Sequence, residues 1–283
     1  MTNEIFLDTS IVIRRDLGTK EIKERIKERV SHYDACVTGL VVRQEYKRRL
    51  LAEAQYLLRQ LHEKKSLTEL HDHVLNVLPP QQERKRKIAL GLIAKFFPTA
   101  EEPERTERFR RTLRTLLRIG LRQFDETFDR VLWDSGCSCA KFPVIEKIPY
   151  KRYDLGPTKC SKTGGACGIG DFFKSRETEC KAILARLKEL PPEKKSTQLK
   201  AIETGLEHVL KNPTTAPNLD PCLSVGDLVI ALESNGIRTF YTLNSKESQH
   251  LSRALDQDLV IRPNDPAKAE ITHLHTDSVW PEY

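Results

Sequence analysis

The sequence lacks any apolar run approaching the roughly 20 uninterrupted residues of a membrane-spanning helix. Its first residues also lack the basic segment and apolar core of a secretory signal peptide. From these two absences we expect a cytoplasmic protein with no membrane partner.

Cysteine is sparse and odd in number, with seven residues in a chain of 283. In a cytoplasmic protein of this length such residues indicate reduced thiols or metal ligands rather than a disulfide framework. Hydrophobic residues make up 39% of the chain, which is enough for a sizeable core and argues against disorder. The 47 Lys and Arg exceed the 40 Asp and Glu by seven, a surplus that favours polyanionic partners, above all nucleic acid.

Both ends of the chain have the rhythm of an α/β protein. Near the N-terminus, an apolar strand at residues 5–7 precedes a charged helix at 19–31 and a second strand at 35–40. Near the C-terminus, "GDLVIALESNG" indicates a helix, "IRTFYTL" a strand, "SKESQHLSRAL" a helix and "DLVIRP" a last strand. We expect the two ends to form halves of one parallel sheet.

Strand signals almost vanish between these ends, where charged, helix-forming sequence is broken by turns such as "LPPQQ" and "NPTTAPN". The sequence therefore predicts an α/β core from residues 1–50 and 218–268 and a mostly helical insertion over 51–217. Residues 269–283 carry no usable period and are interpreted as a C-terminal surface tail.

Polar side chains occur where the chain leaves the predicted sheet. Asp8 closes the first strand, Glu45 lies one helical turn after the second, and Asp227 opens a helix after a small-residue turn. Asn244 follows the third strand, with Glu247 three residues later. Because ligand sites collect beyond the carboxyl ends of parallel strands, we expect these side chains to converge.

Such a group of acids would repel itself unless a divalent cation neutralised it, and Mg²⁺ and Mn²⁺ prefer oxygen ligands of this kind. A bound metal lowers the pKa of its water and stabilises the leaving oxygen in phosphodiester hydrolysis. Taken singly, each residue also fits a structural role. Asp8 suits an Asx turn, Asp227 a helix N-cap, Glu45 a first-turn helix acid and Asn244 a turn.

Four segments, taken in order along the chain, resemble the successive motifs of the PIN-domain nucleases. They are "IFLDTSIVI", Glu45 after "VTGLVV", "GDLVIAL" and "FYTLNSKE". The resemblance covers about residues 1–50 and 218–265. It implies a three-layer α/β/α fold with a short parallel sheet, and Mg²⁺- or Mn²⁺-dependent cleavage of RNA or, in some branches, DNA. It places Asp8, Glu45 and Asp227 as metal ligands, Ser10 as the residue that orders metal-bound water, and Asn244 in support.

The chain departs from this family pattern in two ways. Asn244 stands where many members carry a fourth Asp, and its amide brings no negative charge. Either Glu247 compensates, or a second metal binds only with substrate. The insertion makes the chain longer than the small bacterial toxins of the family, so a toxin-like or defence-like role stays open. Asp171 in "CGIGDFF" echoes Asp227 in "CLSVGDL", but a long charged helix with no following strand makes it the weaker candidate.

A basic arm spans residues 83–122, where twelve Lys or Arg and five Glu give a surplus of seven. Four arginines share one face of a predicted amphipathic helix and could bind successive phosphates, in which case affinity would fall with salt. The alternative is a solvated face that pairs with nearby Glu residues. Few aromatics interleave, so base stacking is not indicated. The four arginines are Arg111, Arg114, Arg118 and Arg122.

Five cysteines cluster within residues 137–180. Four of them could supply thiolates to a structural Zn²⁺, but neither pair has the CxxC spacing of a zinc ribbon, so reduced or redox-active thiols are preferred. These four are Cys137, Cys139, Cys160 and Cys167.

We thus expect a PIN-like, metal-dependent nuclease acting on RNA, with single-stranded DNA not excluded. The insertion would bind substrate or an inhibitory or regulatory protein partner, and a homodimer stays open. The rival hypotheses are a non-catalytic nucleic-acid-binding or regulatory protein with a degenerate site, and a metal-dependent phosphatase.

Overall fold

A six-stranded sheet forms the centre of the computed structural model, which describes residues 3–77, 82–96, 101–147, 152–156, 168–211, 226–261 and 270–272. The first five strands in spatial order are parallel, and the sixth, β8, runs antiparallel to β7. The spatial order is β3 (Arg130–Leu132), β2 (Ala35–Gly39), β1 (Glu4–Leu7), β6 (Thr239–Thr242), β7 (Asp258–Ile261) and β8 (Glu270–Thr272).

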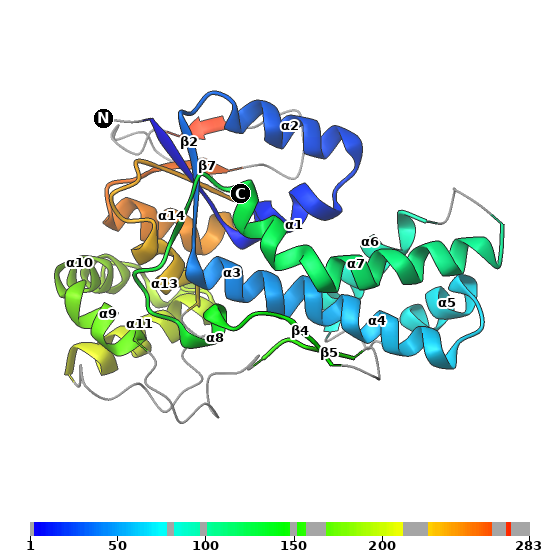
Figure 1. Ribbon diagram of the computed structural model, residues 1–283. Coiled ribbons are helices and arrows are strands. Elements are labelled where there is room, and N and C mark those ends of the chain that lie inside the picture. Colours follow the sequence, from blue (N-terminus) through cyan, green and yellow to red (C-terminus); the bar gives the residue numbers. More distant parts are fainter. Residues whose placement is uncertain are drawn as a thin grey trace.

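Strand β1 lies between β2 and β6, so the two ends of the chain meet in one sheet as the sequence predicted. Its residues Ile5, Phe6 and Leu7 are buried, as expected of a central strand covered on both faces. In Figure 1, one pair of helices lies to one side of the strands and a second pair to the other. The first pair is α1 (Thr9–Leu17) and α2 (Lys20–Val30), the second α13 (Gly226–Glu233) and α14 (Ser245–Ala254). The α/β class is confirmed.

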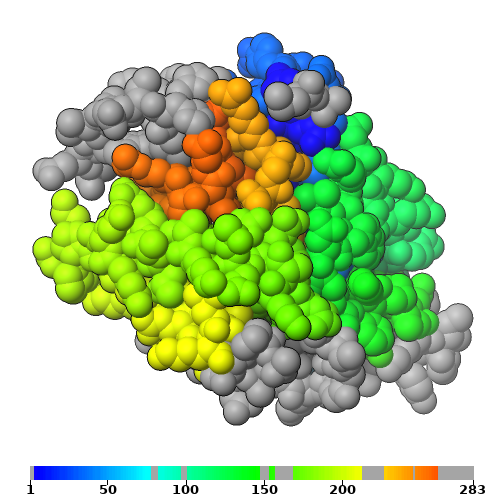
Figure 2. All heavy atoms as spheres, turned by 90° about the vertical axis from the view of Figure 1, so that its left-hand side faces the viewer, coloured from blue at the N-terminus to red at the C-terminus, as the bar shows by residue number. Residues whose placement is uncertain are grey.

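The predicted insertion folds largely into two groups of helices, which flank the sheet at opposite sides of the view in Figure 1. The first group packs through α4 on α7, and the second through α10 on α11 and α14. In Figure 2 the yellow-green helices α9 and α10 lie directly below the orange α14. The first group is α4 (Ala52–Glu63), α5 (Leu67–Val77), α6 (Glu83–Ala94) and α7 (Glu104–Thr127); the second is α9 (Ile169–Ser175), α10 (Glu177–Lys188) and α11 (Thr197–Lys211).

Two strands of the main sheet lie where the sequence predicted none. Strand β3 belongs to the segment assigned to the helical insertion, yet it pairs with β2 in the main sheet. The strand has three residues, Arg130, Val131 and Leu132, and none of them is fully buried. A strand this short gives no recognisable apolar pattern in the sequence. Strand β8 lies in the segment interpreted as a tail. The boundaries at residues 51, 217 and 268 therefore do not separate the sheet from the rest of the chain.

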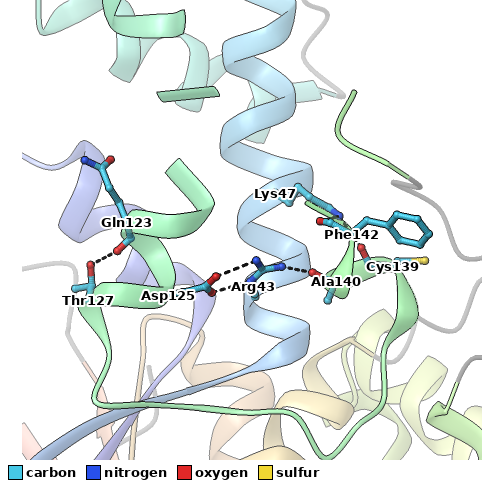
Figure 3. A network of polar contacts seen from close by, with 8 residues as sticks. All are labelled: Arg43, Lys47, Gln123, Asp125, Thr127, Cys139, Ala140 and Phe142. Carbon is cyan, nitrogen blue, oxygen red and sulfur yellow. Dashed lines mark hydrogen bonds and ion pairs between the residues drawn. The ribbon is translucent and has the colours of Figure 1, made fainter. Parts of the chain in front are cut away.

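The helix α3 (Leu40–Tyr46) joins the sheet to the first helical group, because it continues through the π-helical turn η1 (Lys47–Leu51) into α4. Two buried cations on it hold a neighbouring segment, as Figure 3 shows. Arg43 contacts both carboxylate oxygens of Asp125, at 2.7 and 2.9 Å, and donates to the carbonyl of Ala140. Lys47, fully buried, donates to the carbonyl of Cys139 at 2.5 Å and that of Phe142 at 3.4 Å.

These bonds fix the segment that contains α8 (Ser138–Lys141) and precedes the small antiparallel pair β4 (Ile145–Lys147) and β5 (Arg152–Asp154). A 3₁₀ turn, η4 (Pro192–Lys194), links α10 to α11. Within the described ranges, no helix combines the length and apolar character needed to cross a bilayer.

Candidate metal centre

The first acid of the site, Asp8, stands where β1 ends beside β6. Its backbone N–H donates to the carbonyl of Tyr241 at 3.0 Å, which continues the parallel pairing of the two strands. Its carboxylate caps α1 through Oδ1, which accepts from the N–H of Thr9 at 2.5 Å. Asp8 thus has the structural role of a helix cap and also places a carboxylate at the sheet edge.

The second carboxylate oxygen of Asp8 is oriented by two hydroxyls. Oδ2 accepts from Ser10 Oγ at 2.8 Å and from Thr242 Oγ1 at 2.7 Å. Both hydroxyls accept backbone N–H groups in turn, Ser10 from Leu243 at 3.0 Å and Thr242 from Asn244 at 2.9 Å. The turn after β6 is therefore tied to the residues that follow the first strand, and Ser10 contacts Asp8 directly.

Glu45 lies on α3, whose N-terminus is capped from another helix. Gly39, the N-cap residue of α3, has no side chain to cap it; instead the carboxylate of Glu233 on α13 accepts the N–H of Val41 at 3.1 and 3.3 Å. A Cβ at Gly39 would lie 2.1 Å from Glu233 Oε2, so only glycine leaves room for this carboxylate. Glu233 also accepts from the hydroxyl of Ser135. Burial raises the pKa of Glu233 to about 8, even though these donors favour its charged form.

The third predicted acid, Asp227, opens α13 beside Glu45. The side chain of Asn244 donates to Asp227 Oδ2 at 3.4 Å. A Cβ on Gly226 would lie 3.2 Å from Glu45 Oε1, which places Glu45 against the start of the same helix. Asn244 therefore supports Asp227 through its amide.

These side chains line one pocket of about 420 Å³. Asp8 and Glu45 are buried in its wall, and Asp227 is half-buried. Glu247, on the first turn of α14, is a fourth carboxylate in this wall. The structure thus brings the six polar residues predicted at the strand ends to one place: Asp8, Ser10, Glu45, Asp227, Asn244 and Glu247.

Three further polar residues of the described pocket wall were missed by sequence reasoning. Arg49 lies one turn beyond Glu45 in η1 and pairs with it at 2.9 Å, a spacing that the sequence does show. Arg84 of α6 and Gln198 of α11 reach the pocket from the two helical groups. Nothing in the local sequence of either helix indicates this contact, because it depends on how the insertion packs against the sheet.

Electrostatic repulsion among the acids is visible at Asp227. Burial raises its pKa to about 7, and the carboxylates of Asp8, Glu45 and Glu247 add to this effect, while Arg49 opposes it. The described pocket wall holds four carboxylates and two guanidinium groups. Its formal charge is −2 when every group is ionised, which one divalent cation would balance.

The donor set fits a hard divalent cation, since the acids are oxygen donors that repel one another. As the side chains stand, however, no three His, Cys, Asp or Glu residues in the described part of the chain are close enough to share an ion. Glu45 is held by Arg49, and Glu247 accepts from the hydroxyl of Ser196 at 2.8 Å. Binding a cation would require small side-chain rotations that release Glu45 from its arginine.

The other candidate residues lie elsewhere. Asp171 is exposed on α9 and does not line the pocket, which agrees with the preference for Asp227. On α7, Arg111 and Arg122 are exposed and pair with glutamates of the same helix, Glu107 at 3.7 Å and Glu126 at 3.5 Å. The other two arginines of that face are Arg114 and Arg118. Among the described residues, none of the four arginines lines the acidic pocket.

The cysteine cluster is only partly described. The side chains of Cys137 and Cys139 are buried, whereas Cys160 and Cys167 lie outside the described residues. Cys36 is buried in β2, and burial raises the pKa of its thiol to about 12.

Comparison with known proteins does not name the family: no protein-family model, curated protein or solved structure matches this chain.

Proposed function

We propose that this chain is a PIN-like nuclease that uses Mg²⁺ or Mn²⁺ to hydrolyse phosphodiester bonds, with RNA favoured as substrate. One observation carries the proposal: acidic side chains from β1, α3, α13 and α14, far apart in the sequence, line a single polar pocket. The basic surplus of the whole chain favours a polyanionic substrate over a small phosphate. We place this activity in the cytoplasm.

In this proposal Asp8, Glu45 and Asp227 hold the metal, and Asn244 supports them as a neutral donor. When bound, the cation supplies a water of lowered pKa and stabilises charge on the leaving oxygen. The hydroxyls of Ser10 and Thr242 keep Asp8 in its orientation through their bonds to Oδ2.

Two guanidinium groups of the pocket are suited to bind the substrate phosphate. Arg49 loses its carboxylate partner if Glu45 turns to a cation, and it can then pair with a phosphate oxygen. Arg84 is exposed, and no ion pair or hydrogen bond to it occurs among the described residues. The insertion therefore contributes to substrate binding in this account.

The second candidate function is a nucleic-acid-binding or regulatory protein without catalysis. Two observations favour it: an amide, that of Asn244, contacts Asp227, and Arg49 pairs with Glu45.

A cleavage assay with the full chain separates the two. In Mn²⁺, labelled single-stranded RNA should be cut, and Asp8→Asn should reduce the rate by about 100-fold or more because it removes a charged ligand. Asp171→Asn is the matched control, since it makes the same change on an exposed helix and should leave the rate unchanged.

If neither RNA nor single-stranded DNA is cut, and Asp8→Asn leaves nucleic-acid binding intact, the non-catalytic hypothesis replaces ours. Cleavage of mononucleotide phosphates but not of oligonucleotides would instead identify a phosphatase.

A further inference from the structure

A second cavity, of about 550 Å³, lies between α1, α6 and α7, apart from the acidic pocket. Its size is within the range of small-molecule sites. Its inner wall is aromatic and apolar: the half-buried Phe96 is the phenylalanine that a ligand can reach, and the fully buried Phe109 and Phe124 back the wall. Phe96 and Phe109 meet at a tilt, with ring centroids 5.1 Å apart. Such a wall favours a flat, apolar ring.

The outer wall of this cavity is cationic. Lys95, just after α6, donates to the backbone carbonyl of Asp16. Burial lowers the pKa of Lys95, and the positive charge of the nearby Lys23 on α2 lowers it further. Arg15 completes the group and lies 4.9 Å above the ring of Phe128. Three positive side chains thus gather at one side of a cavity.

The two acids of the described wall, Asp16 and Glu126, offset part of this charge and leave a formal charge of +1 when every group is ionised. Asp16 accepts from Arg15 Nε at 3.2 Å and from the hydroxyl of Tyr46 at 2.9 Å, so both of its oxygens are engaged. Glu126, the second acid of the described wall, pairs with Arg122 at 3.5 Å. Asp16 attracts Lys95 electrostatically, but neither lysine forms an ion pair with a carboxylate among the described residues, and the two lysines repel each other. An anion placed between them would be stabilised by both.

We propose that this cavity binds a nucleotide, with the phosphate at Lys23 and Lys95 and the base against the phenylalanine wall. A nucleotide joins a negatively charged phosphate to a flat ring. Aromatic side chains can stack on any base, because every base has a π-face. A bare phosphate would leave the aromatic wall unused.

The ligand has two sources, a free mononucleotide or one unit of a bound strand. Binding one unit of a strand rests on the proposed nuclease function. It is suggested by the position of α6, whose residues line both pockets. Arg84 near its start faces the acids, and Lys95 just past its end faces this cavity. The eleven residue steps from Arg84 to Lys95 span about 16 Å. That length corresponds to about five stacked nucleotides at 3.4 Å each.

Isothermal titration calorimetry on the full chain in EDTA tests the proposal without any cleavage, with AMP and inorganic phosphate as probes. We expect AMP to bind at least tenfold tighter than phosphate. The double variant Lys23→Gln, Lys95→Gln should weaken AMP binding at least tenfold. The control Lys20→Gln, Lys27→Gln removes the same charge from the exposed part of α2 and should bind AMP as the wild type does.

A second variant tests the base contact independently of charge. Phe96→Ala should weaken AMP binding but leave phosphate binding unchanged. The proposal is overturned if AMP does not bind, if the lysine variant binds it as tightly as the control does, or if phosphate binds as well as AMP.

The source is then identified by fluorescence anisotropy with labelled strands of two and eight nucleotides, again in EDTA. If the cavity binds a unit of a strand, the lysine variant loses affinity for the octamer and not for the dimer. If it binds free nucleotide, AMP binds at least as tightly as the octamer. Either result supports the site, and neither depends on whether the acidic pocket is catalytic.

Discussion

At the scale of single residues, the geometry of the acidic pocket depends on neighbouring groups that orient its carboxylates through hydrogen bonds or helix capping. Asp8 is held by two hydroxyls and by the N–H of Thr9. Glu45 is placed by a helix whose N-terminus is capped by Glu233. Since neighbours of this kind orient metal ligands, their loss should affect the site without removing a ligand.

Glu233 gives a prediction about pH. Its carboxyl has a pKa of about 8 in the folded protein against 4.5 when exposed, because burial disfavours its charge. The folded state therefore binds more protons than the unfolded state between these values, and its stability falls as pH rises through this window. The slope due to this group is at most about 1.4 kcal/mol for each pH unit.

Glu233→Gln should remove that slope, since glutamine stays neutral and keeps an oxygen to accept the N–H of Val41. Urea unfolding of both proteins between pH 5 and pH 9 measures the difference. An equally steep fall for wild type and variant would mean that another group controls the pH dependence.

Part of the site could be read from the sequence, because Asp8, Glu45 and Asn244 each follow a strand and Asp227 opens a helix at the same edge of the sheet. Arg84 and Gln198 could not, since their place in the pocket arises from tertiary packing of helices whose own sequences look like ordinary charged surface. The hydrogen bond from Thr242 to Asp8 was also missed, because a single polar residue at the end of a strand does not indicate in the sequence what its side chain contacts.

At the scale of elements, long periodic segments were predictable and short ones were not. The apolar positions of α4 are buried as their spacing indicates. Helix α1 was not predicted, because "SIVI" is β-branched and continues the apolar run of β1, whereas the cap by Asp8 turns the chain into a helix. Strand β3 is three half-exposed residues and exists through its pairing with β2.

The link between α3 and α8 gives a second prediction. Lys47 is fully buried, and its ammonium group serves two backbone carbonyls. Lys47→Met keeps the apolar stem but leaves those carbonyls unsatisfied, so we expect a loss of about 1–3 kcal/mol in the free energy of unfolding. Arg48→Met, at the neighbouring half-buried position, serves as the control and should cost less than 1 kcal/mol by the usual behaviour of surface changes.

Chemical denaturation measures both variants. If Lys47→Met is as stable as wild type, the bonds of Lys47 to Cys139 and Phe142 contribute nothing net to the stability of this segment.

At the scale of the whole molecule, the sheet carries the acidic pocket and the two helical groups reach it from opposite sides. Arg84 and Gln198 come from different groups, α6 and α11, and both line the pocket. The insertion is therefore part of the site, which explains why the outer segments of the sequence alone gave an incomplete account.

The basic surface of α7 gives a third prediction, about salt. If its four arginines contact phosphates of a single strand, replacing all of them by glutamine should reduce the slope of log affinity against log salt by about 2–3. The arginines are Arg111, Arg114, Arg118 and Arg122.

A matched control removes four exposed lysines from other helices: Lys20, Lys27, Lys181 and Lys188. Equal slopes for the two variants, measured by anisotropy with a labelled RNA, would show that the arginines serve only their intrahelical pairs with glutamate.

The central claim is that carboxylates from separate parts of the chain share one divalent cation. A crystal structure of the full chain soaked in Mn²⁺ tests it most directly, through the anomalous signal of the metal. We predict a peak bounded by Asp8, Glu45 and Asp227, with Glu45 turned away from Arg49. A map with no peak in the acidic pocket at millimolar Mn²⁺, and with the Glu45–Arg49 pair intact, would contradict the account.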